Sequence, residues 1–321
     1  MKIKELTIGT IVEITLVVAS ATARETKAKK PFLALEFYDG TDTICGNYWD
    51  WLGERIPEKN SILDVKAQVT EYMGAKQLNV KSMTLNTERH LSEFMPTSNL
   101  DISKVYKDAY AEAVDIKDDF LRNISVGILE QLRTKWLDVP GAKGVHHAFV
   151  GGTLVHCLSV AKIARAISAS IPQSNDELCF VGGLLHDIGK LFTYKVSGVS
   201  IEMTDIGTLY DHTFIGAEFV GNFAEGQHWF DDDDDKLQAK LEILRHVILS
   251  HHGMLEYGAA VPPMCVEAHV VNHADGVDAS VQQVIEHSAK KGDVKWTDKI
   301  YTLSNRPHLT THYVKAVFSE N

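Results

Sequence analysis

The sequence predicts a multidomain fold in which a five-stranded β-barrel is followed by an all-α domain. Up to about residue 90, short runs alternate between apolar and polar side chains and are separated by turn residues, which is typical of strands. Beyond that point, apolar residues recur at helical spacing over longer runs. A chain of 321 residues is long enough for two hydrophobic cores.

The barrel is predicted from five strand-like runs. They cover residues 9–20, 31–38, 43–49, 62–72 and 77–83. A short helix is expected over 51–55, between the third and fourth runs. Five strands with a helix after the third is the arrangement of the OB-fold, a partly open barrel that binds oligonucleotides on its second and third strands. We therefore assign residues 1–88 to an OB-type barrel that binds nucleic acid.

Candidate nucleic-acid contacts lie in and beside these strands. Single-strand binding requires aromatic faces for the bases and cations for the phosphates. The aromatic candidates are Phe37, Tyr48, Trp49 and Tyr72, and the cationic candidates on the first loop are Arg24, Lys27, Lys29 and Lys30. Strand alternation must place about half of the aromatic side chains in the core, and the loop cations serve equally well as a solubilising surface. Sequence alone leaves both alternatives open.

Helices are expected from the connector onward. Asp101 is expected to begin a helix that places Tyr106 and Tyr110 at helical spacing. Another helix is expected over 118–136, before Pro140. The remaining divisions are a helical connector at 89–117, an all-α domain at 118–295 and a tail of mixed strand and loop at 296–321.

Seven residues in the second half form the most informative pattern of the chain. They are His156, His186, Asp187, His212, His251, His252 and Asp275. Most lie on or at the end of an apolar, helix-like run; His156, for example, shares a predicted buried helix face with Val160 and Ile167. Burying such side chains without partners would cost roughly several kcal/mol each. Imidazole and carboxylate together suit divalent transition metals, so the pattern predicts a metal site.

The order of these residues resembles that of the HD superfamily of metal-dependent phosphohydrolases, and GGLLHDIGK at 182–190 is close to its central motif. Further motifs are HHAFVGGTLVHCLSVA, LLHDIGKLF, DHTFIGAEFV, ILSHHGMLEYGAAVPP and EAHVVNHADGVDA, with KPFLALEFYDGTDTICGNYWD and VTEYMGAKQLNV in the barrel. From about residue 8 to about residue 285, the chain resembles the YhaM-type 3'-to-5' exoribonucleases, which join an OB-fold to an HD domain.

This resemblance implies a site for two metal ions. His156, His186 and Asp275 would hold one ion, His212 with His251 or His252 the other, and Asp187 would bridge both as a catalytic ligand. A set rich in histidine favours Mn²⁺, Co²⁺, Ni²⁺ or Fe²⁺ over Mg²⁺, and the resemblance points to two Mn²⁺ ions.

The resemblance also assigns roles around the metals. Lys190 would neutralise charge on the phosphoryl group during catalysis, although a surface lysine near a helix end is the simpler alternative. His146 and His147 would support the ligands or contact the substrate. In the barrel, the resemblance adds Gln77 to the nucleic-acid contacts.

Charge and composition set further bounds. The net charge of −11 argues against tight binding of nucleic acid, but residues 1–90 are neutral, with 12 basic and 12 acidic side chains. Part of the remaining excess is the run Asp231–Asp235, which we expect to be a solvated loop. An acidic body predicts modest, salt-sensitive affinity for polymers.

Cysteine usage and hydropathy indicate a cytoplasmic protein without membrane association. The cysteines Cys45, Cys157, Cys179 and Cys265 form no CxxC pair or disulfide framework, which suits a reducing compartment. The apolar stretch at 11–18 is too short to span a bilayer, and we expect no signal peptide.

The leading functional hypothesis is a phosphodiesterase that removes nucleotides from the 3' end of single-stranded RNA, with DNA as a second polymer. The partner is then single-stranded nucleic acid, RNA preferred, and homo-oligomerisation stays open. One alternative is a hydrolase of dNTPs or cyclic nucleotides, since HD domains support several substrates. Another is a nucleic-acid-binding adaptor with a structural metal site, against which the full ligand set argues.

Overall fold

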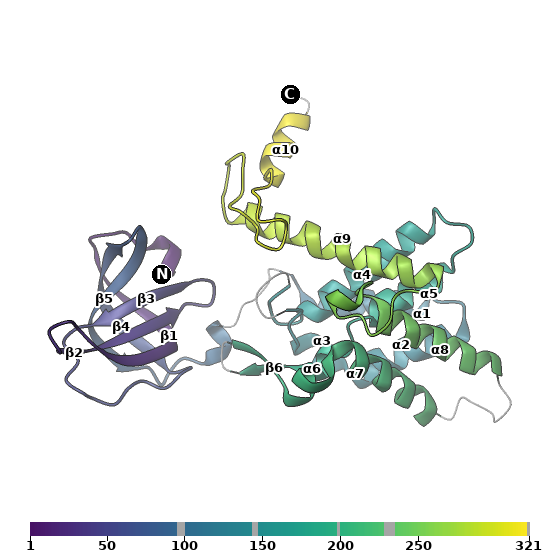
Figure 1. Ribbon diagram of the computed structural model, residues 1–321, viewed down its shortest axis with the longest axis horizontal. Coiled ribbons are helices and arrows are strands. Elements are labelled where there is room, and N and C mark those ends of the chain that lie inside the picture. The colour runs from purple at the N-terminus through teal and green to yellow at the C-terminus, as the bar shows by residue number, and fades with distance from the viewer. Residues whose placement is uncertain (95–99, 143–146, 198–199, 228–234, 320–321) are drawn as a thin grey trace. The chain divides into compact units, whose positions relative to one another are not determined.

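The structure is a computed structural model that describes residues 1–321 except for 95–99, 143–146, 198–199, 228–234 and 320–321 (Figure 1). The chain divides into two compact units, Met1–Thr97 with Val196–Ser200, and Ser98–Lys195 with Ile201–Asn321. Each unit has a hydrophobic core of its own.

Five strands form a closed barrel in the first unit. They are β1 (Ile11–Glu25), β2 (Pro31–Tyr38), β3 (Thr43–Tyr48), β4 (Ile62–Tyr72) and β5 (Ala75–Leu85). The order around the barrel is β1-β2-β3-β5-β4, and β1 closes it by pairing with both β2 and β4. β3 pairs with β5 in parallel, whereas the other pairs are antiparallel. This is the strand order of an OB-fold, so the predicted barrel is confirmed.

Alternation along the strands builds the core of this barrel. Leu33 and Leu78 are fully buried, while their neighbours in sequence are more exposed. The ring of Phe37 also fills the interior, and it needs the glycine at position 46 on the neighbouring strand. A Cβ at Gly46 would lie 2.8 Å from Cε2 of Phe37.

The helix expected over 51–55 is wrong, because the structure has bends and irregular backbone there. Gly53 has a φ of 94°, which is left-handed and ends any right-handed helix at this point. The indole nitrogen of Trp51 donates to the carbonyl of Glu54 at 3.1 Å, so a side chain supplies a hydrogen bond that fixes the turn.

The second unit is helical. Its helices are α1 (Ile102–Val114), α2 (Asp119–Gln131), α3 (Arg133–Asp138), α4 (Gly152–Ser168), α5 (Asp176–Leu185), α6 (Lys190–Thr193), α7 (Asp205–Gly226), α8 (Asp235–Ser250), α9 (Val266–Ala289) and α10 (Thr311–Phe318). This unit also has a short 3-10 helix at Leu255–Tyr257, and the first unit has two, at Ile3–Glu5 and Leu91–Phe94. The strands β6 (Tyr194–Ser197) and β7 (Ser200–Met203) form a two-stranded sheet between α6 and α7.

Capping side chains begin several of these helices. The carboxylate of Asp101 accepts from the backbone nitrogen of Lys104 at 3.1 Å, which confirms the helix start expected at this residue. Asp118 and Asn175 cap α2 and α5 in the same way. The helix expected over 118–136 is two helices, since Leu132 leaves helical geometry between α2 and α3.

The centre of this unit is the packing of α4 against α5 and α9. Gly183 on α5 makes the first of these contacts close, because a Cβ there would lie 2.7 Å from the Cα of Ala161 on α4. The end of α5, where His186 follows, thereby lies beside the second turn of α4, where His156 lies.

The tail differs from the expected mixture of strand and loop. Isolated bridges join Trp296 to Leu309 and Ile300 to Arg306, but residues 311–318 form α10. Thr310 caps this helix, its hydroxyl accepting from the backbone nitrogen of Tyr313 at 3.3 Å. The cap and the helical apolar spacing were both visible in the sequence.

Candidate metal centre

The seven predicted ligands come from helices that are far apart in sequence. His156 lies in the second turn of α4, and His186 caps the C-terminal end of α5, with Asp187 directly after it. His212 lies in α7, and Asp275 lies on α9. The pair His251 and His252 follows the last residue of α8.

Two backbone features bring His212 to Asp187. Gly189 packs directly on α7, since a Cβ at this position would lie 1.9 Å from the carbonyl oxygen of His212. Asp211 interrupts α7 with φ 60° and ψ 163°, a conformation that is costly for a residue with a side chain. Its carboxylate accepts from both the backbone nitrogen and Nδ1 of His212, each at 2.5 Å, and these bonds hold the imidazole at the kink.

One group of ligand atoms surrounds Nε2 of His156. This atom lies 3.2 Å from Nε2 of His186, 3.1 Å from Oδ1 of Asp275 and 3.3 Å from Oδ2 of Asp187. Nε2 of His186 lies 3.4 Å from the same oxygen of Asp187. Three helices therefore present two imidazoles and two carboxylates to one point.

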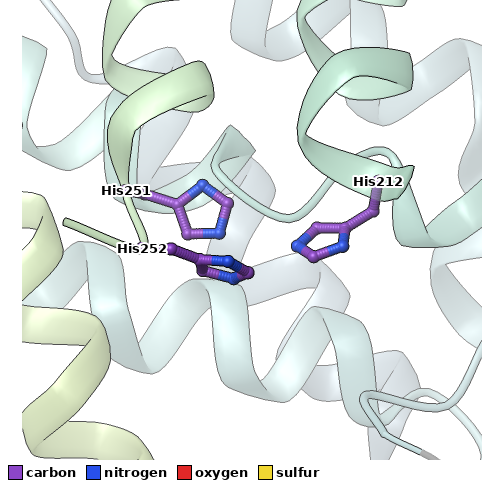
Figure 2. Close-up of side chains that lie close together, drawn as sticks. All are labelled: His212, His251 and His252. Carbon is purple, nitrogen blue, oxygen red and sulfur yellow. The ribbon is translucent and has the colours of Figure 1, made fainter. Parts of the chain in front are cut away.

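A second group lies on the other side of Asp187. Figure 2 shows the side chains of His251 and His252 leaving the end of α8 and that of His212 leaving α7, with the three rings facing one another. Oδ1 of Asp187 lies 3.2 Å from Nε2 of His212 and 3.7 Å from Nε2 of His251. The two oxygens of Asp187 thus face two different sets of histidines.

Hydrogen bonds to Nδ1 fix which nitrogen each imidazole presents. The Nδ1 atoms of His186 and His251 lie 2.7 Å from the carbonyl oxygens of Gly183 and Ile248. A carbonyl only accepts, so Nδ1 carries the proton and Nε2 keeps a free lone pair. Nδ1 of His156 lies 2.7 Å from a carboxylate oxygen of Asp278. An imidazole held in this manner is oriented to bind a metal through Nε2.

Several inward atoms are buried without a hydrogen bond among the described residues. They are Oδ1 of Asp187, Nε2 of His212, Nε2 of His251 and Nδ1 of His252. Leaving such atoms unsatisfied costs about 1–3 kcal/mol each, and more for a charged group. Divalent metal ions would satisfy such atoms where they converge, because these residues belong to groups whose ligand atoms lie within 4.8 Å of one another, and Oδ1 of Asp187 lies 3.2 Å from Nε2 of His212. The residues present therefore fit metal ions.

The electrostatics of the site also favour cations. Burial would raise the pKa of Asp187, but Lys190 and His186 outweigh this effect and hold that pKa well below its usual range. Burial would lower the pKa of His156, yet Asp187, Asp275 and Asp278 raise it well above its ordinary value. Carboxylates that draw a proton to this point would equally draw a metal ion.

Two of the three imidazoles of the second group are held neutral, whereas Asp187 and Asp211 outweigh burial and raise the pKa of His212. Burial and repulsion from His186 keep the pKa of His251 well below its ordinary value. Burial, followed by His212, lowers the pKa of His252. Neutral imidazole is the form that binds metals.

Lys190 lies inside the site. Its ammonium nitrogen is 2.6 Å from Oδ2 of Asp187, and its side chain is largely buried. Burial would lower the pKa of Lys190, but the attraction of Asp187 raises it above the ordinary value. The alternative of a solvated surface lysine is therefore wrong.

Sequence reasoning missed Asp278. One oxygen of this buried carboxylate contacts His156 as described above, and the same oxygen lies 3.0 Å from Nε2 of His147. Ser159 donates to its other oxygen at 2.5 Å. The available signal was the spacing DGVD, since Asp278 lies three residues after Asp275 and hence on a neighbouring part of the same helix face. His147 lies beside the ligands as expected, while His146 is outside the described residues.

The barrel candidates are placed differently from one another. Phe37 is fully buried in the core, so its ring has no free face, and its assignment as a nucleic-acid contact is corrected on that ground. Trp49 is 39% exposed and stacks on Phe32, with 4.5 Å between ring centroids. Tyr72 is exposed, and Tyr48 and Gln77 are half-buried. The loop cations Arg24, Lys27, Lys29 and Lys30 are all exposed.

Comparison with known proteins agrees with this arrangement. The family model described as HD domain matches residues 153–280, a stretch that contains all seven predicted ligands. The 3'-5' exoribonuclease YhaM of Geobacillus sp. (strain WCH70) is 29% identical over 320 residues, which cover 97% of this chain and 94% of that protein. The resemblance inferred from the motifs is confirmed.

Two solved structures each match about a quarter of the chain. A domain of replication protein A from Methanococcus maripaludis is 26% identical and covers 26% of this chain and 92% of its own, with a TM-score of 0.24. The second OB-fold domain of replication protein A from the same organism is 21% identical and covers 28% and 96%, also with a TM-score of 0.24. TM-scores this low carry no argument about the fold, so the OB assignment rests on the strand order of the barrel.

Within the part of the chain that the structure describes, none of the helices combines the length and the apolar character that a bilayer span requires.

Proposed function

We propose that this chain, which carries an HD domain over residues 153–280 and is similar to YhaM over nearly its whole length, is a metal-dependent 3'-to-5' exonuclease. Its substrate would be single-stranded RNA, with single-stranded DNA as a second polymer. The observation that carries the proposal is the position of Asp187, whose two oxygens face two separate sets of histidines.

Two divalent ions fit this arrangement. His156, His186 and Asp275 would hold one ion with Oδ2 of Asp187. His212, with His251 and His252, would hold the other with Oδ1 of Asp187. Bound there, the ions would supply a water of lowered pKa and positive charge on the phosphoryl oxygens. Histidine-rich ligand sets favour Mn²⁺ among the common cations, with Co²⁺, Ni²⁺ and Fe²⁺ as alternatives.

Phosphodiester hydrolysis at this site would release one nucleotide at a time. The oxygen of water bonds to phosphorus, the bond from phosphorus to O3' of the preceding nucleotide breaks, and one proton of the water ends on O3'. The shortened strand keeps a 3'-hydroxyl, and the terminal nucleotide leaves as a 5'-monophosphate.

The chain's own residues would orient this reaction. Asp187 stays ionised because Lys190 lies 2.6 Å from it, so it is available as a bridging ligand. Lys190 would also offset charge that develops on the phosphoryl group. His147 and Asp278 would hold His156 from the side away from the substrate.

The barrel would hold the strand whose end is cut. OB-folds bind single strands through aromatic stacking and cations, and the exposed Trp49, Tyr72 and loop cations are the candidates for this role. Residues 1–88 would thus bind the polymer, and 118–295 would cut it. We place the protein in the cytoplasm, since its four cysteines, all within the described residues, are free thiols.

A time course with 5'-labelled single-stranded RNA and DNA in Mn²⁺ tests the proposal. Wild-type protein is expected to give a ladder that shortens from the 3' end. Asp187→Ala should lower the rate by more than about a thousandfold, the scale on which removing one member of an interdependent catalytic set acts. Circular dichroism of the variant checks that the fold is retained.

The matched control is His269→Ala, which removes an exposed imidazole from α9 outside the ligand set. This variant should degrade RNA at the wild-type rate. Activity retained by Asp187→Ala would refute the site. Intact oligonucleotides with wild-type protein would favour a small-nucleotide hydrolase, to be tested with dNTPs and cyclic nucleotides, and binding without any hydrolysis would favour an adaptor.

A further inference from the structure

A pocket opens beside the metal centre. It has a volume of about 600 Å³ and lies between the 3-10 helix Leu255–Tyr257 and the middle of α9. Its wall includes two predicted ligands, His252 and Asp275, so a molecule in the pocket lies next to the site of hydrolysis. The volume is in the range of about 300–1,000 Å³ that small-molecule sites occupy.

The pocket has an aromatic rim. The side chain of Tyr257 lines it and is 71% exposed. The backbone nitrogen of Tyr257 donates to the carbonyl oxygen of Met254 at 3.0 Å. The next residue, Gly258, ends the 3-10 helix with a φ of 94°. Both features hold the backbone of Tyr257 in place. Val277 and Val281 on α9 add exposed apolar surface to the wall. An exposed aromatic ring and apolar side chains lining the same pocket suit a flat ligand such as a base.

A glycine keeps the pocket open. Gly276 lines the pocket, directly after Asp275, in the interior of the long helix α9. A glycine in a helix interior is about 1 kcal/mol less favourable than alanine. No packing contact requires this one, since a Cβ at Gly276 would meet no heavy atom within 4 Å. A glycine without a steric reason in the protein itself points to the close approach of a ligand.

From these features we infer that the pocket binds the 3'-terminal nucleotide of the substrate. The base stacks on Tyr257, the sugar lies over Gly276, and the phosphate reaches the metal centre through His252 and Asp275. The inference rests on the proposed exonuclease activity and adds to it a site that recognises the nucleotide about to leave.

Inhibition by product-like molecules tests the role of Tyr257. Adenosine 5'-monophosphate and ribose 5-phosphate share the sugar phosphate, and only the first has a base. Both are measured as inhibitors of the hydrolysis of bis-p-nitrophenyl phosphate in Mn²⁺. With wild-type protein, adenosine 5'-monophosphate is expected to inhibit about fivefold to a hundredfold more strongly, as one base stack allows. Tyr257→Ala should remove most of this difference.

The matched control is Leu255→Ala in the same 3-10 helix. Leu255 is 62% exposed but does not line the pocket, so its truncation should leave the preference for adenosine 5'-monophosphate intact. Equal inhibition by the two compounds in wild-type protein, or an unchanged preference in Tyr257→Ala, would overturn the inference.

A leucine series tests the role of Gly276. Gly276→Leu should raise the melting temperature, because leucine is the better helix former, and should lower kcat/KM on oligonucleotides at least about tenfold by filling the pocket. Metal stoichiometry should stay as in wild type. Gly226→Leu is the control, since this exposed helical glycine also has open space around it and lies about 21 Å along α7 from His212. An unchanged kcat/KM in Gly276→Leu would overturn the inference.

The outcomes separate this inference from the proposed function. If wild-type protein leaves oligonucleotides intact but still prefers adenosine 5'-monophosphate through Tyr257, the nucleotide pocket is supported and the proposed exonuclease activity is refuted. If oligonucleotides are degraded and the preference is absent, the exonuclease stands and the pocket falls.

Discussion

At the scale of single residues, the candidate metal centre depends on groups that hold the imidazoles from behind. Each of His156, His186, His212 and His251 has a partner at Nδ1, so that Nε2 points inward. Two of these partners are backbone carbonyls, which no substitution removes. The other two are Asp278 and Asp211, and they can be tested.

Asp278→Ala should weaken metal binding at His156. The imidazole loses the carboxylate that fixes its ring, and losses of such supports typically cost about 10–100-fold in metal affinity. Calorimetric titration of Mn²⁺ measures this effect directly: wild-type protein should bind about two ions per chain, and the variant should bind one of them more weakly. Hydrolysis should recover at high Mn²⁺.

Asp278→Asn separates orientation from charge. An amide oxygen can still accept from Nδ1, so this variant should bind Mn²⁺ with intermediate affinity. Wild-type affinity in Asp278→Ala would mean that the contact at 2.7 Å has no part in holding His156.

The sequence pointed to a common site where chemistry and spacing coincided. Histidines and two aspartates at the ends of apolar runs indicated candidate ligands, and the structure places all seven close together, while their binding of metal stays a prediction. Asp278 was missed because an acidic residue three positions along a helix is usually solvated, and its partner His156 is far away in sequence. Phe37 was misjudged because alternation shows that one face of a strand is buried without showing which one.

At the scale of elements, two aromatic side chains of the barrel differ in burial. Phe37 on β2 lies in the core, and Trp49, directly after β3, is exposed. Phe37→Leu should lower the free energy of unfolding of the barrel by about 1–2 kcal/mol, because it leaves space in a packed core. Trp49→Ala should instead raise KM for oligonucleotides severalfold, since the exposed ring is available for stacking.

Each of these variants is the control for the other. The free energy of unfolding of each variant is measured with denaturant. Steady-state kinetics are measured for the two variants at a temperature at which both proteins are folded. A raised KM in Phe37→Leu with an unchanged KM in Trp49→Ala would place the binding surface elsewhere. Hydrolysis of bis-p-nitrophenyl phosphate should be the same in both variants as in wild type, because neither residue belongs to the metal-centre unit.

The elements themselves were predictable where local signals agreed. Five alternating runs gave five strands, and Asp101 and Asp118 began helices. The short helix expected after β3 was wrong because Gly53 takes a left-handed conformation that the pattern of apolar residues does not reveal. In the tail, a mixture of strand and loop was expected, whereas residues 311–318 form the helix α10, which Thr310 caps.

At the scale of the whole molecule, the two units have separate cores and should unfold as separate transitions. Mn²⁺ should raise the melting temperature of the helical unit alone. At a hundred times the dissociation constant, one bound ion stabilises by about 2.7 kcal/mol, which corresponds to about 5–10 °C. Differential scanning calorimetry with and without Mn²⁺ measures the shift.

Variants assign the transitions. Phe37→Leu should move the barrel transition, and Asp187→Ala should abolish most of the shift that Mn²⁺ causes. A shift of the barrel transition by Mn²⁺ would show metal binding outside the predicted ligands.

The short parallel pairing of β3 with β5, which closes the barrel, affects the order in which the barrel folds. Where β3 meets β5, the structure pairs Cys45 with Gln77, Gly46 with Leu78 and Asn47 with Asn79, and the strands run parallel. The β4–β5 hairpin is local in sequence and far longer, so loop entropy favours its early formation. The short parallel join should then be the last step of folding and the first to open. While it is open, β3 and β5 present unpaired edges, which exposes the chain to aggregation at this join.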